Sequence, residues 1–158
     1  MFDFSLCKIG RINNISFEQI NIFKDTRGWL CEMYRNDEMN ADTLPMMSYV
    51  SLTYPDIMRG PHEHIYQTDT FILLGMSTMR IYLWDNRTDS DTFMNRSEID
   101  CEEGRIYRLI VPPKVIHGYK NIGSKDSLII NFPNKLFAGE MKKEEIDEVR
   151  YEKFYLSK

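Results

Sequence analysis

Three histidines carry the strongest chemical signal in this sequence, because imidazole exchanges protons near neutral pH and is also a common metal ligand. They are His62, His64 and His117, and the chain has no others. Residues two apart on a β-strand share a face, so His62 and His64 should point the same way. The residue types alone leave two kinds of site open, one that transfers protons and one that holds a metal ion.

The histidines lie in two compact motifs rather than in featureless loops. The first reads RGPHEH over 59–64, and the second reads PPKVIHGYKN over 112–121. A lone histidine is usually a surface or core residue with a satisfied hydrogen bond. Three histidines in two such dense segments favour a functional site instead.

Short runs rich in Ile, Val, Tyr, Phe and Trp must position these motifs. Each run is bounded by Gly, Pro, Asn or Asp, which is typical of strands joined by turns. The runs cover 17–23, 29–34, 47–54, 70–74, 79–84, 106–111, 116–120 and 128–132, with a turn at 24–28. Many short strands at this spacing predict an all-β sandwich or barrel. Only the segment 142–151, with strong helix formers and mixed charge, predicts a short C-terminal helical segment.

The composition excludes several functional classes. The 158 residues suit a single domain over 1–158, and a net charge of −4 argues against a nucleic-acid-binding surface. No apolar run approaches the roughly 18 residues of a membrane helix, and residues 1–10 lack the layout of a signal peptide. The odd, widely spaced Cys7, Cys31 and Cys101 favour a reduced, cytoplasmic protein.

Both histidine motifs resemble those of the cupin superfamily, which implies a jelly-roll β-barrel with its site in the barrel mouth. The first cupin motif is matched by His62, His64, Asp69 and Gly75, and the second by Gly104, Pro112, His117 and Asn121. Asp69 stands where the motif has glutamate, and Lys114 where it has glycine. In a metal-dependent cupin the ligands would be His62, His64, Asp69 and His117, a set suited to zinc, manganese or iron.

A narrower resemblance is to the dTDP-4-dehydrorhamnose 3,5-epimerase family, a metal-free branch of the cupins. Its motifs are matched in order by FKDTRGWLCE at 23–32, MRGPH at 58–62, WDNRTDSDTF at 84–93 and VPPKVIHGY at 111–119, and loosely by 131–139. Together these segments cover most of residues 20–140. The ordered set is more specific than any one segment.

This resemblance implies an isomerase, an epimerase of nucleotide-linked 4-keto sugars that works without cofactor or metal in surface-polysaccharide or deoxysugar biosynthesis. A keto group acidifies the neighbouring C–H bond, and His62 matches the histidine that removes the proton. Arg59 would bind the diphosphate or the keto oxygen, since a guanidinium forks onto such oxygens. The other implied substrate-binding residues are His64, His117, Tyr119 and Asn131.

The resemblance also implies a homodimer whose N-terminal strands, over 17–34, pack on the partner. Arg27 and Glu32 match positions that contact the nucleotide across the dimer interface in the family. Trp29 beside them offers either a stacking surface or a core side chain.

Three family features are missing from this sequence. The family's tyrosine acid has no counterpart in 128–132, its lysine none in 67–71, and for its C-terminal aspartate Asp147 is only a distant candidate. Inversion at one carbon, with Tyr119 or water returning the proton, therefore fits better than inversion at two. The alternatives are a 3,4-ketoisomerase, a metal-dependent cupin enzyme and a catalytically inactive sugar-nucleotide-binding module.

Overall fold

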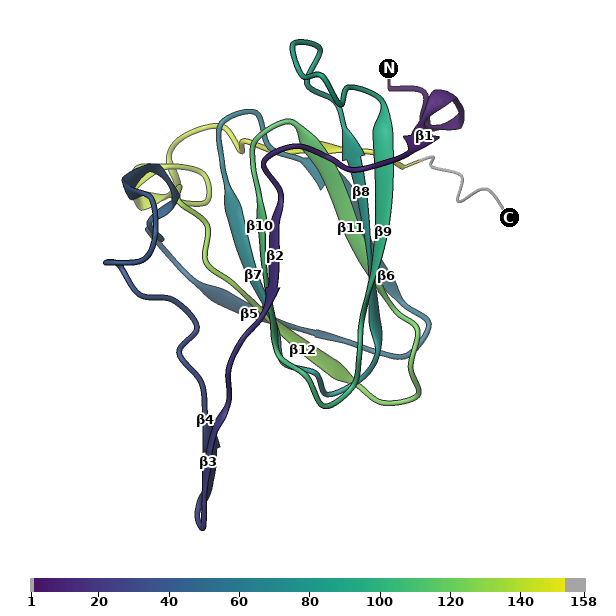
Figure 1. The fold of residues 1–158 in the computed structure, drawn as a ribbon. Helices are drawn as coiled ribbons and strands as arrows, with labels where there is room; N and C mark the ends of the chain where they lie inside the picture. The colour runs from purple at the N-terminus through teal and green to yellow at the C-terminus, as the bar shows by residue number, and fades with distance from the viewer. Residues whose placement is uncertain (1, 153–158) are drawn as a thin grey trace.

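Two β-sheets face each other and form a flattened barrel in the computed structural model, which describes residues 2–152 (Figure 1). One sheet has the strand order β1-β9-β8-β11-β6-β13. Its strands are β1 (Lys8–Ile9), β6 (Met58–Glu63), β8 (Met79–Asp85), β9 (Asn95–Cys101), β11 (Val115–Asn121) and β13 (Val149–Arg150).

The second sheet has the order β2-β10-β7-β12-β5. Its strands are β2 (Ser16–Gln19), β5 (Tyr49–Thr53), β7 (Asp69–Leu73), β10 (Tyr107–Val111) and β12 (Ser127–Asn131). Within both sheets the only parallel strand pair is β1 with β9, among the described residues. The jelly-roll β-barrel expected from the sequence is confirmed.

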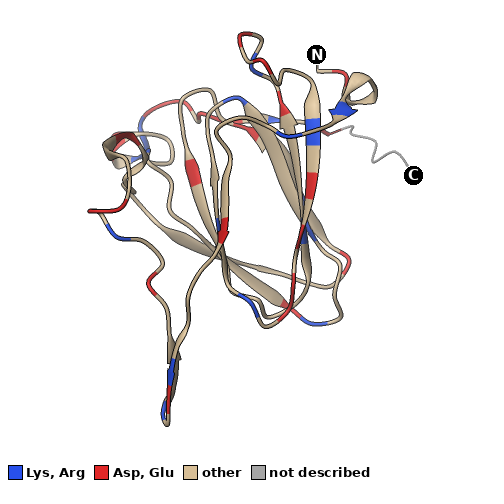
Figure 2. Cartoon of the chain, in the orientation of Figure 1, with Lys and Arg blue, Asp and Glu red and all other residues tan. Residues whose placement is uncertain are grey.

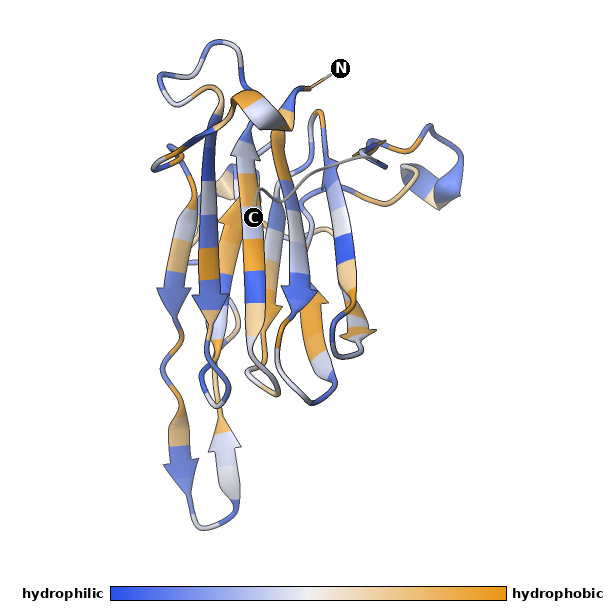
Figure 3. Ribbon diagram, turned by 90° about the vertical axis from the view of Figure 1, so that its right-hand side faces the viewer, coloured by the Kyte–Doolittle hydropathy of each residue, from blue (hydrophilic) through white to orange (hydrophobic). Residues whose placement is uncertain are grey.

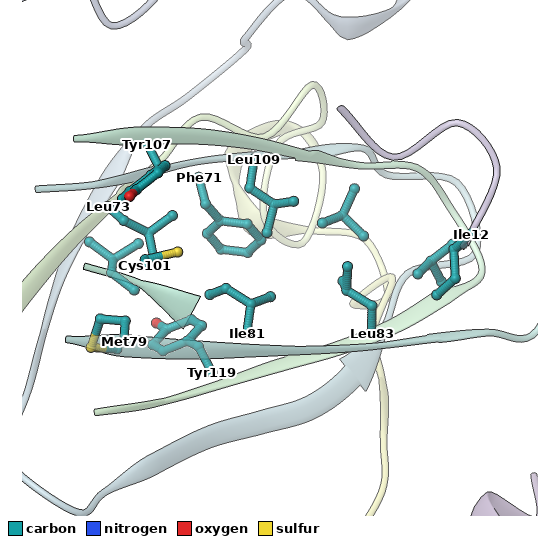
Figure 4. Close-up of a cluster of buried hydrophobic side chains, with 13 residues drawn as sticks. Ile12, Phe71, Leu73, Met79, Ile81, Leu83, Cys101, Tyr107, Leu109 and Tyr119 are labelled. Atoms are coloured by element: carbon teal, nitrogen blue, oxygen red, sulfur yellow. The ribbon is translucent and has the colours of Figure 1, made fainter. Parts of the chain in front are cut away.

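The core lies between the sheets, where alternate side chains of both point inward (Figure 4). Met79, Ile81 and Leu83 of β8 enter this cluster together, as the alternation over 79–84 predicts. The intervening Tyr82 and Trp84 pack on the other face of β8, in a separate aromatic cluster. Hydrophobic and hydrophilic residues therefore alternate along several strands (Figure 3).

A third, two-stranded sheet projects away from the barrel (Figures 1 and 3). It is the hairpin of β3 (Phe23–Asp25) and β4 (Gly28–Leu30), which pair antiparallel. All of its residues are exposed, including Phe23, Trp29 and Leu30, each more than half exposed. An isolated two-stranded hairpin is only marginally stable in water, so this apolar surface is unusual for a free element.

The α-helix expected over 142–151 does not form. The described C-terminal segment holds a 3₁₀ turn at Glu140–Lys142 (η3) and then β13, which pairs with Glu63 and His62 of β6. Two further 3₁₀ turns are η1 (Phe4–Leu6), near the N-terminus, and η2 (Ala41–Thr43), between β4 and β5. A lone ten-residue helix is marginal in water, whereas the edge of β6 offers backbone partners.

Basic and acidic residues are interspersed along the chain (Figure 2). None of the helical turns in residues 2–152 has the length and apolar character needed to span a bilayer.

Candidate active site

The three histidines meet at one end of the barrel interior, where His62 and His64 line a cavity of about 780 Å³ and His117 packs against them. The cavity has walls from both sheets: Tyr49 and Ser51 come from β5, and Arg59 and His62 from β6. The segment from Ile146 to Glu152 closes part of its rim. A cavity therefore lies in the barrel mouth, where the sequence predicts a site.

Strand pairing brings His62 and His117 together. They are direct partners between the antiparallel strands β6 and β11, and their ring centroids lie 4.4 Å apart. Gly60 lets these strands approach closely, because a Cβ there would lie 2.7 Å from the carbonyl oxygen of His117 and φ is +82°. The glycine of the RGPH motif is thus a requirement of the site's geometry.

Asp69 is the buried carboxylate that joins the histidines. It begins β7 and is 1% exposed, and its Oδ2 lies 3.2 Å from His64 Nε2 and 3.3 Å from His117 Nε2. Its Oδ1 accepts hydrogen bonds from Gln67 Nε2 at 2.9 Å and from Asn131 Nδ2 at 2.7 Å. Burial opposes ionisation of Asp69, but the interactions with His117 and His64 outweigh it and lower the pKa of the carboxyl.

His64 forms an ion pair with this carboxylate. Burial works against its charge, but the interactions with Asp69 and Asp147 together outweigh burial and raise the pKa of His64. Its Nδ1 faces the backbone carbonyl of Asp147, which can only accept, so Nδ1 carries a proton. His117 is held in the same way by a 2.9 Å hydrogen bond from Nδ1 to the carbonyl of Val115. Both rings are therefore fixed in orientation.

His62 differs from the other two. In the described part of the chain its ring makes no hydrogen bond, and it lines the cavity. Burial, followed by the neighbouring His117 and His64, lowers the pKa of His62 to about 3. The ring is consequently neutral at physiological pH, with an unshared electron pair free to accept a proton from a molecule in the cavity.

Arg59, Tyr119 and Asn131 lie around the histidines as the sequence predicts. Arg59 donates from Nε to Thr53 Oγ1 at 3.0 Å and from a terminal nitrogen to the Leu52 carbonyl at 2.7 Å. Tyr119 is 7% exposed, and its hydroxyl lies 3.0 Å from Ser51 Oγ. Arg59 remains exposed at the cavity and has further N–H groups to offer an anion.

Arg27 and Glu32 are not brought to this cavity within one chain. Arg27 lies at the tip of the β3–β4 hairpin, where it pairs with Asp25, and its side chain is 86% exposed. Glu32 lines a separate surface hollow of about 210 Å³ and pairs with Arg35 at 3.3 Å. The exposed Trp29 is not a core residue, which answers the question the sequence leaves open.

Asp147 has a different role from the one considered from the sequence. Its carboxylate accepts backbone hydrogen bonds from Ile65, Tyr66 and Gln67 at 2.8, 2.9 and 2.9 Å. It therefore fixes the loop between β6 and β7 and, through its carbonyl, His64 rather than His62. No sequence signal short of the fold indicates that residues 80 positions apart meet in this way.

Tyr49 is the site residue that sequence analysis missed. It lines the cavity, stands opposite Asn131 in the β5–β12 register, and its hydroxyl accepts a 3.1 Å hydrogen bond from Asn131 Nδ2. Burial raises the pKa of Tyr49 to about 12. The alternation of the run 47–54 could have indicated it, since Tyr49 and Ser51 share a face.

The four residues His62, His64, Asp69 and His117 could also hold a metal ion. One ligand atom from each lies within 4.8 Å of the others. Imidazole nitrogens with one carboxylate oxygen suit zinc, iron or manganese. The same geometry is thus compatible with either a bound metal ion or proton transfer.

Comparison with known proteins gives a consistent result. The sequence model of the dTDP-4-dehydrorhamnose 3,5-epimerase family matches residues 10–144. A protein of Haloferax volcanii described as a probable low-salt glycan biosynthesis epimerase, Agl13, is 35% identical over 136 residues, which are 85% of this chain and 86% of that protein.

Solved structures share the fold. A dTDP sugar isomerase from Desulfovibrio desulfuricans superimposes with a TM-score of 0.76 at 17% identity, covering 89% of this chain and 85% of that one. ChmJ from Streptomyces bikiniensis, a 3′-monoepimerase in complex with dTDP-quinovose, gives a TM-score of 0.72 at 14% identity, covering 82% and 68%.

Proposed function

Because the chain belongs to the dTDP-4-dehydrorhamnose 3,5-epimerase family, and is therefore an isomerase, we propose that it inverts one carbon of a nucleotide-linked 4-keto sugar with His62 as the base. The observation that carries the proposal is the state of His62. Its ring is neutral, faces the cavity and has no hydrogen-bond partner among the described residues, while His64 and His117 are held by Asp69.

The site chemistry follows from the keto group. Removal of a proton from the carbon beside it gives an enolate, whose negative charge rests mainly on the former keto oxygen. His62 takes the proton, and the N–H groups of Arg59 lie at the same cavity to pair with the oxygen or with a phosphate. His117 packs against His62 and holds the His62 ring in position. The positive charge of His64 is balanced by the carboxylate of Asp69.

A glycan or polysaccharide pathway is the setting of this reaction. The relative from Haloferax volcanii is described as acting in glycan biosynthesis. ChmJ has a dTDP-sugar bound, which supports a nucleotide sugar as the ligand of this cavity. Free Cys7, Cys31 and Cys101 agree with a cytoplasmic location, where thiols stay reduced.

The exposed hairpin supports a homodimer. Phe23, Trp29 and Leu30 present apolar surface that a single chain leaves in water. We infer that this hairpin packs on a second copy and that Arg27 and Glu32 reach the nucleotide of the partner's site from there.

Solvent deuterium exchange tests the proposed activity. The protein is incubated in D₂O with dTDP-, UDP- and GDP-linked 4-keto-6-deoxyhexoses, and the sugar C3 and C5 positions are followed by NMR. Exchange with formation of an epimer at one carbon is the expected result. Movement of the keto group to C3 would identify a ketoisomerase, and nucleotide binding without exchange would identify a binding module.

A metal-dependent cupin enzyme is the second candidate, favoured by the cluster of His62, His64, Asp69 and His117. A metal-bound imidazole cannot accept a proton, so the two candidates exclude each other at His62. Elemental analysis of the purified protein separates them. Metal near one ion per chain, with activity lost on chelation and regained on metal addition, would replace the proton-transfer proposal.

A further inference from the structure

Inversion of a carbon requires two groups, one that removes the proton from one face and one that supplies a proton to the other. His62 stands on β6, in the six-stranded sheet. A proton donor for the opposite face should therefore come from the five-stranded sheet, across the cavity. This requirement follows from the stereochemistry of the reaction and from the two-walled shape of the site.

Tyr49 meets this requirement and Tyr119 does not. Tyr49 lies on β5 in the five-stranded sheet, lines the cavity and is 44% exposed. Tyr119 also lines the cavity, but it lies on β11 in the same sheet as His62, is 7% exposed, and has its hydroxyl engaged by Ser51 Oγ at 3.0 Å. A substrate between the sheets would have His62 on one side and Tyr49 on the other.

Hydrogen bonding at Asn131 leaves the proton of Tyr49 free. Asp69 Oδ1 can only accept, so the Asn131 atom 2.7 Å from it is the amide nitrogen. That nitrogen has two hydrogens; one goes to Asp69, and the other to the Tyr49 oxygen at 3.1 Å. The Tyr49 oxygen is thus an acceptor here, and its own O–H hydrogen has no acceptor among residues 2–152.

We propose that Tyr49 is the acid of this active site, and that its hydroxyl returns a proton to the face of the sugar carbon opposite His62. The assignment rests on the proposed epimerase function. His62 accepts the C–H proton and becomes an imidazolium; the enolate carbon then takes the Tyr49 proton, which leaves a phenolate. Water in the open cavity removes the proton from His62 and supplies one to Tyr49, so the enzyme returns to its starting state.

Asn131 is a positioning residue in this arrangement. Its amide N–H points at the Tyr49 oxygen and stabilises the phenolate once the proton has left. The same amide is anchored by the buried Asp69, which also holds His64 and His117. One carboxylate therefore orients both the base side and the acid side of the site.

The test separates proton removal from proton return. Tyr49→Phe, Tyr119→Phe and the control Tyr54→Phe are compared in D₂O with the 4-keto-6-deoxyhexose panel; Tyr54 is 64% exposed and does not line the cavity. NMR measures two rates: deuterium entering substrate of unchanged configuration, and formation of the epimer. Thermal unfolding and dTDP binding verify that each variant is folded.

For Tyr49→Phe, epimer formation should fall by about 100-fold or more, whereas deuterium exchange into unchanged substrate should continue, because His62 still removes the proton. Tyr54→Phe should form the epimer close to the wild-type rate, and Tyr119→Phe should keep the wild-type ratio of epimer formation to deuterium exchange, because a lost binding contact slows both alike. Wild-type epimer formation by Tyr49→Phe would overturn the assignment, and loss in Tyr119→Phe alone would transfer it to Tyr119. Absence of exchange in the wild-type protein would instead overturn the epimerase function itself, and the assignment of Tyr49 with it.

Discussion

His62 and His117 face each other directly across β6 and β11 with ring centroids 4.4 Å apart, yet their surroundings differ. His117 is hydrogen-bonded to the Val115 carbonyl and lies against Asp69. His62 has neither kind of contact. The pairing therefore sets a free imidazole beside a fixed one, as a site needs when one ring accepts a proton and its neighbour keeps it in place.

The lowered pKa of His62 predicts a specific pH dependence of stability. The unfolded chain binds a proton at His62 near pH 6.5, and the folded protein only near pH 3. Between these values the unfolded state holds more protons, so the free energy of unfolding falls as pH falls, by at most about 1.4 kcal/mol per pH unit. His62→Asn should lose this dependence and gain stability relative to wild type on acidification.

Urea unfolding from pH 7 to pH 4 measures the effect, and His64→Asn is a control of opposite sign. The pKa of His64 is raised, so its stabilisation is present below about pH 6.5 and is lost as pH rises through the folded-state pKa. His64→Asn should therefore lose most stability at low pH. Parallel pH curves for wild type and His62→Asn would contradict the assignment of a neutral His62.

Asp69→Asn should destabilise the protein by about 3–5 kcal/mol, because it leaves the buried His64 and His117 without their shared carboxylate. Chemical denaturation at pH 7 gives the free energy of unfolding. Asp56→Asn is the matched control: its side chain is 89% exposed and pairs with Lys120 only at 3.5 Å, so the change should be within about 0.5 kcal/mol. Equal effects of the two substitutions would show that Asp69 does not organise the site.

Asp147→Ala should loosen the loop between β6 and β7. Three backbone N–H groups, those of Ile65, Tyr66 and Gln67, lose their acceptor, which should cost about 2 kcal/mol. Hydrogen exchange should become faster at these amides and remain unchanged in the core strand β8. Glu145→Ala, at an exposed position, is the control and should leave hydrogen exchange of these amides unchanged. Unchanged protection of amides 65–67 in Asp147→Ala would show that Asp147 does not hold the loop.

Trp29→Asp tests the inferred dimer. Light scattering of the wild-type protein at micromolar concentration should give twice the chain mass of 18.8 kDa. A charge at Trp29, which is 54% exposed on the hairpin, should shift the protein toward monomer, because it places a carboxylate in the apolar contact. Ile9→Asp, on exposed β1, should leave the mass unchanged. A monomeric mass for the wild-type protein would contradict the inferred dimer.

Most of the barrel could be predicted from the sequence, because its core strands alternate and are bounded by turn residues. The exceptions were β1, β6, β9 and β13, which no predicted run covers. Strand β9, NRSEIDC, has few apolar residues and lies on an exposed part of the sheet. The helix predicted for 142–151 was wrong because helix formers without an apolar face do not outweigh backbone pairing with β6.

The histidine pair could be predicted because its residues lie in two recognisable motifs. The link from Asp69 through Asn131 to Tyr49 could not, because it depends on the register of β7, β12 and β5, whose sequences are far apart. The run 128–132 has no tyrosine, but the neighbouring strand β5 places Tyr49 opposite Asn131. Cross-strand neighbours are fixed by tertiary structure and leave no local sequence signal.

The most direct test of the central claim is deuterium exchange into the C3 and C5 positions of a 4-keto sugar nucleotide by wild type, His62→Asn and His64→Asn. His62→Asn removes the free base and should slow exchange by about 100-fold or more, with dTDP binding nearly unchanged. His64→Asn should lose much less, because His64 is already paired with Asp69. Exchange at the wild-type rate by His62→Asn, together with its loss in His64→Asn, would contradict the account.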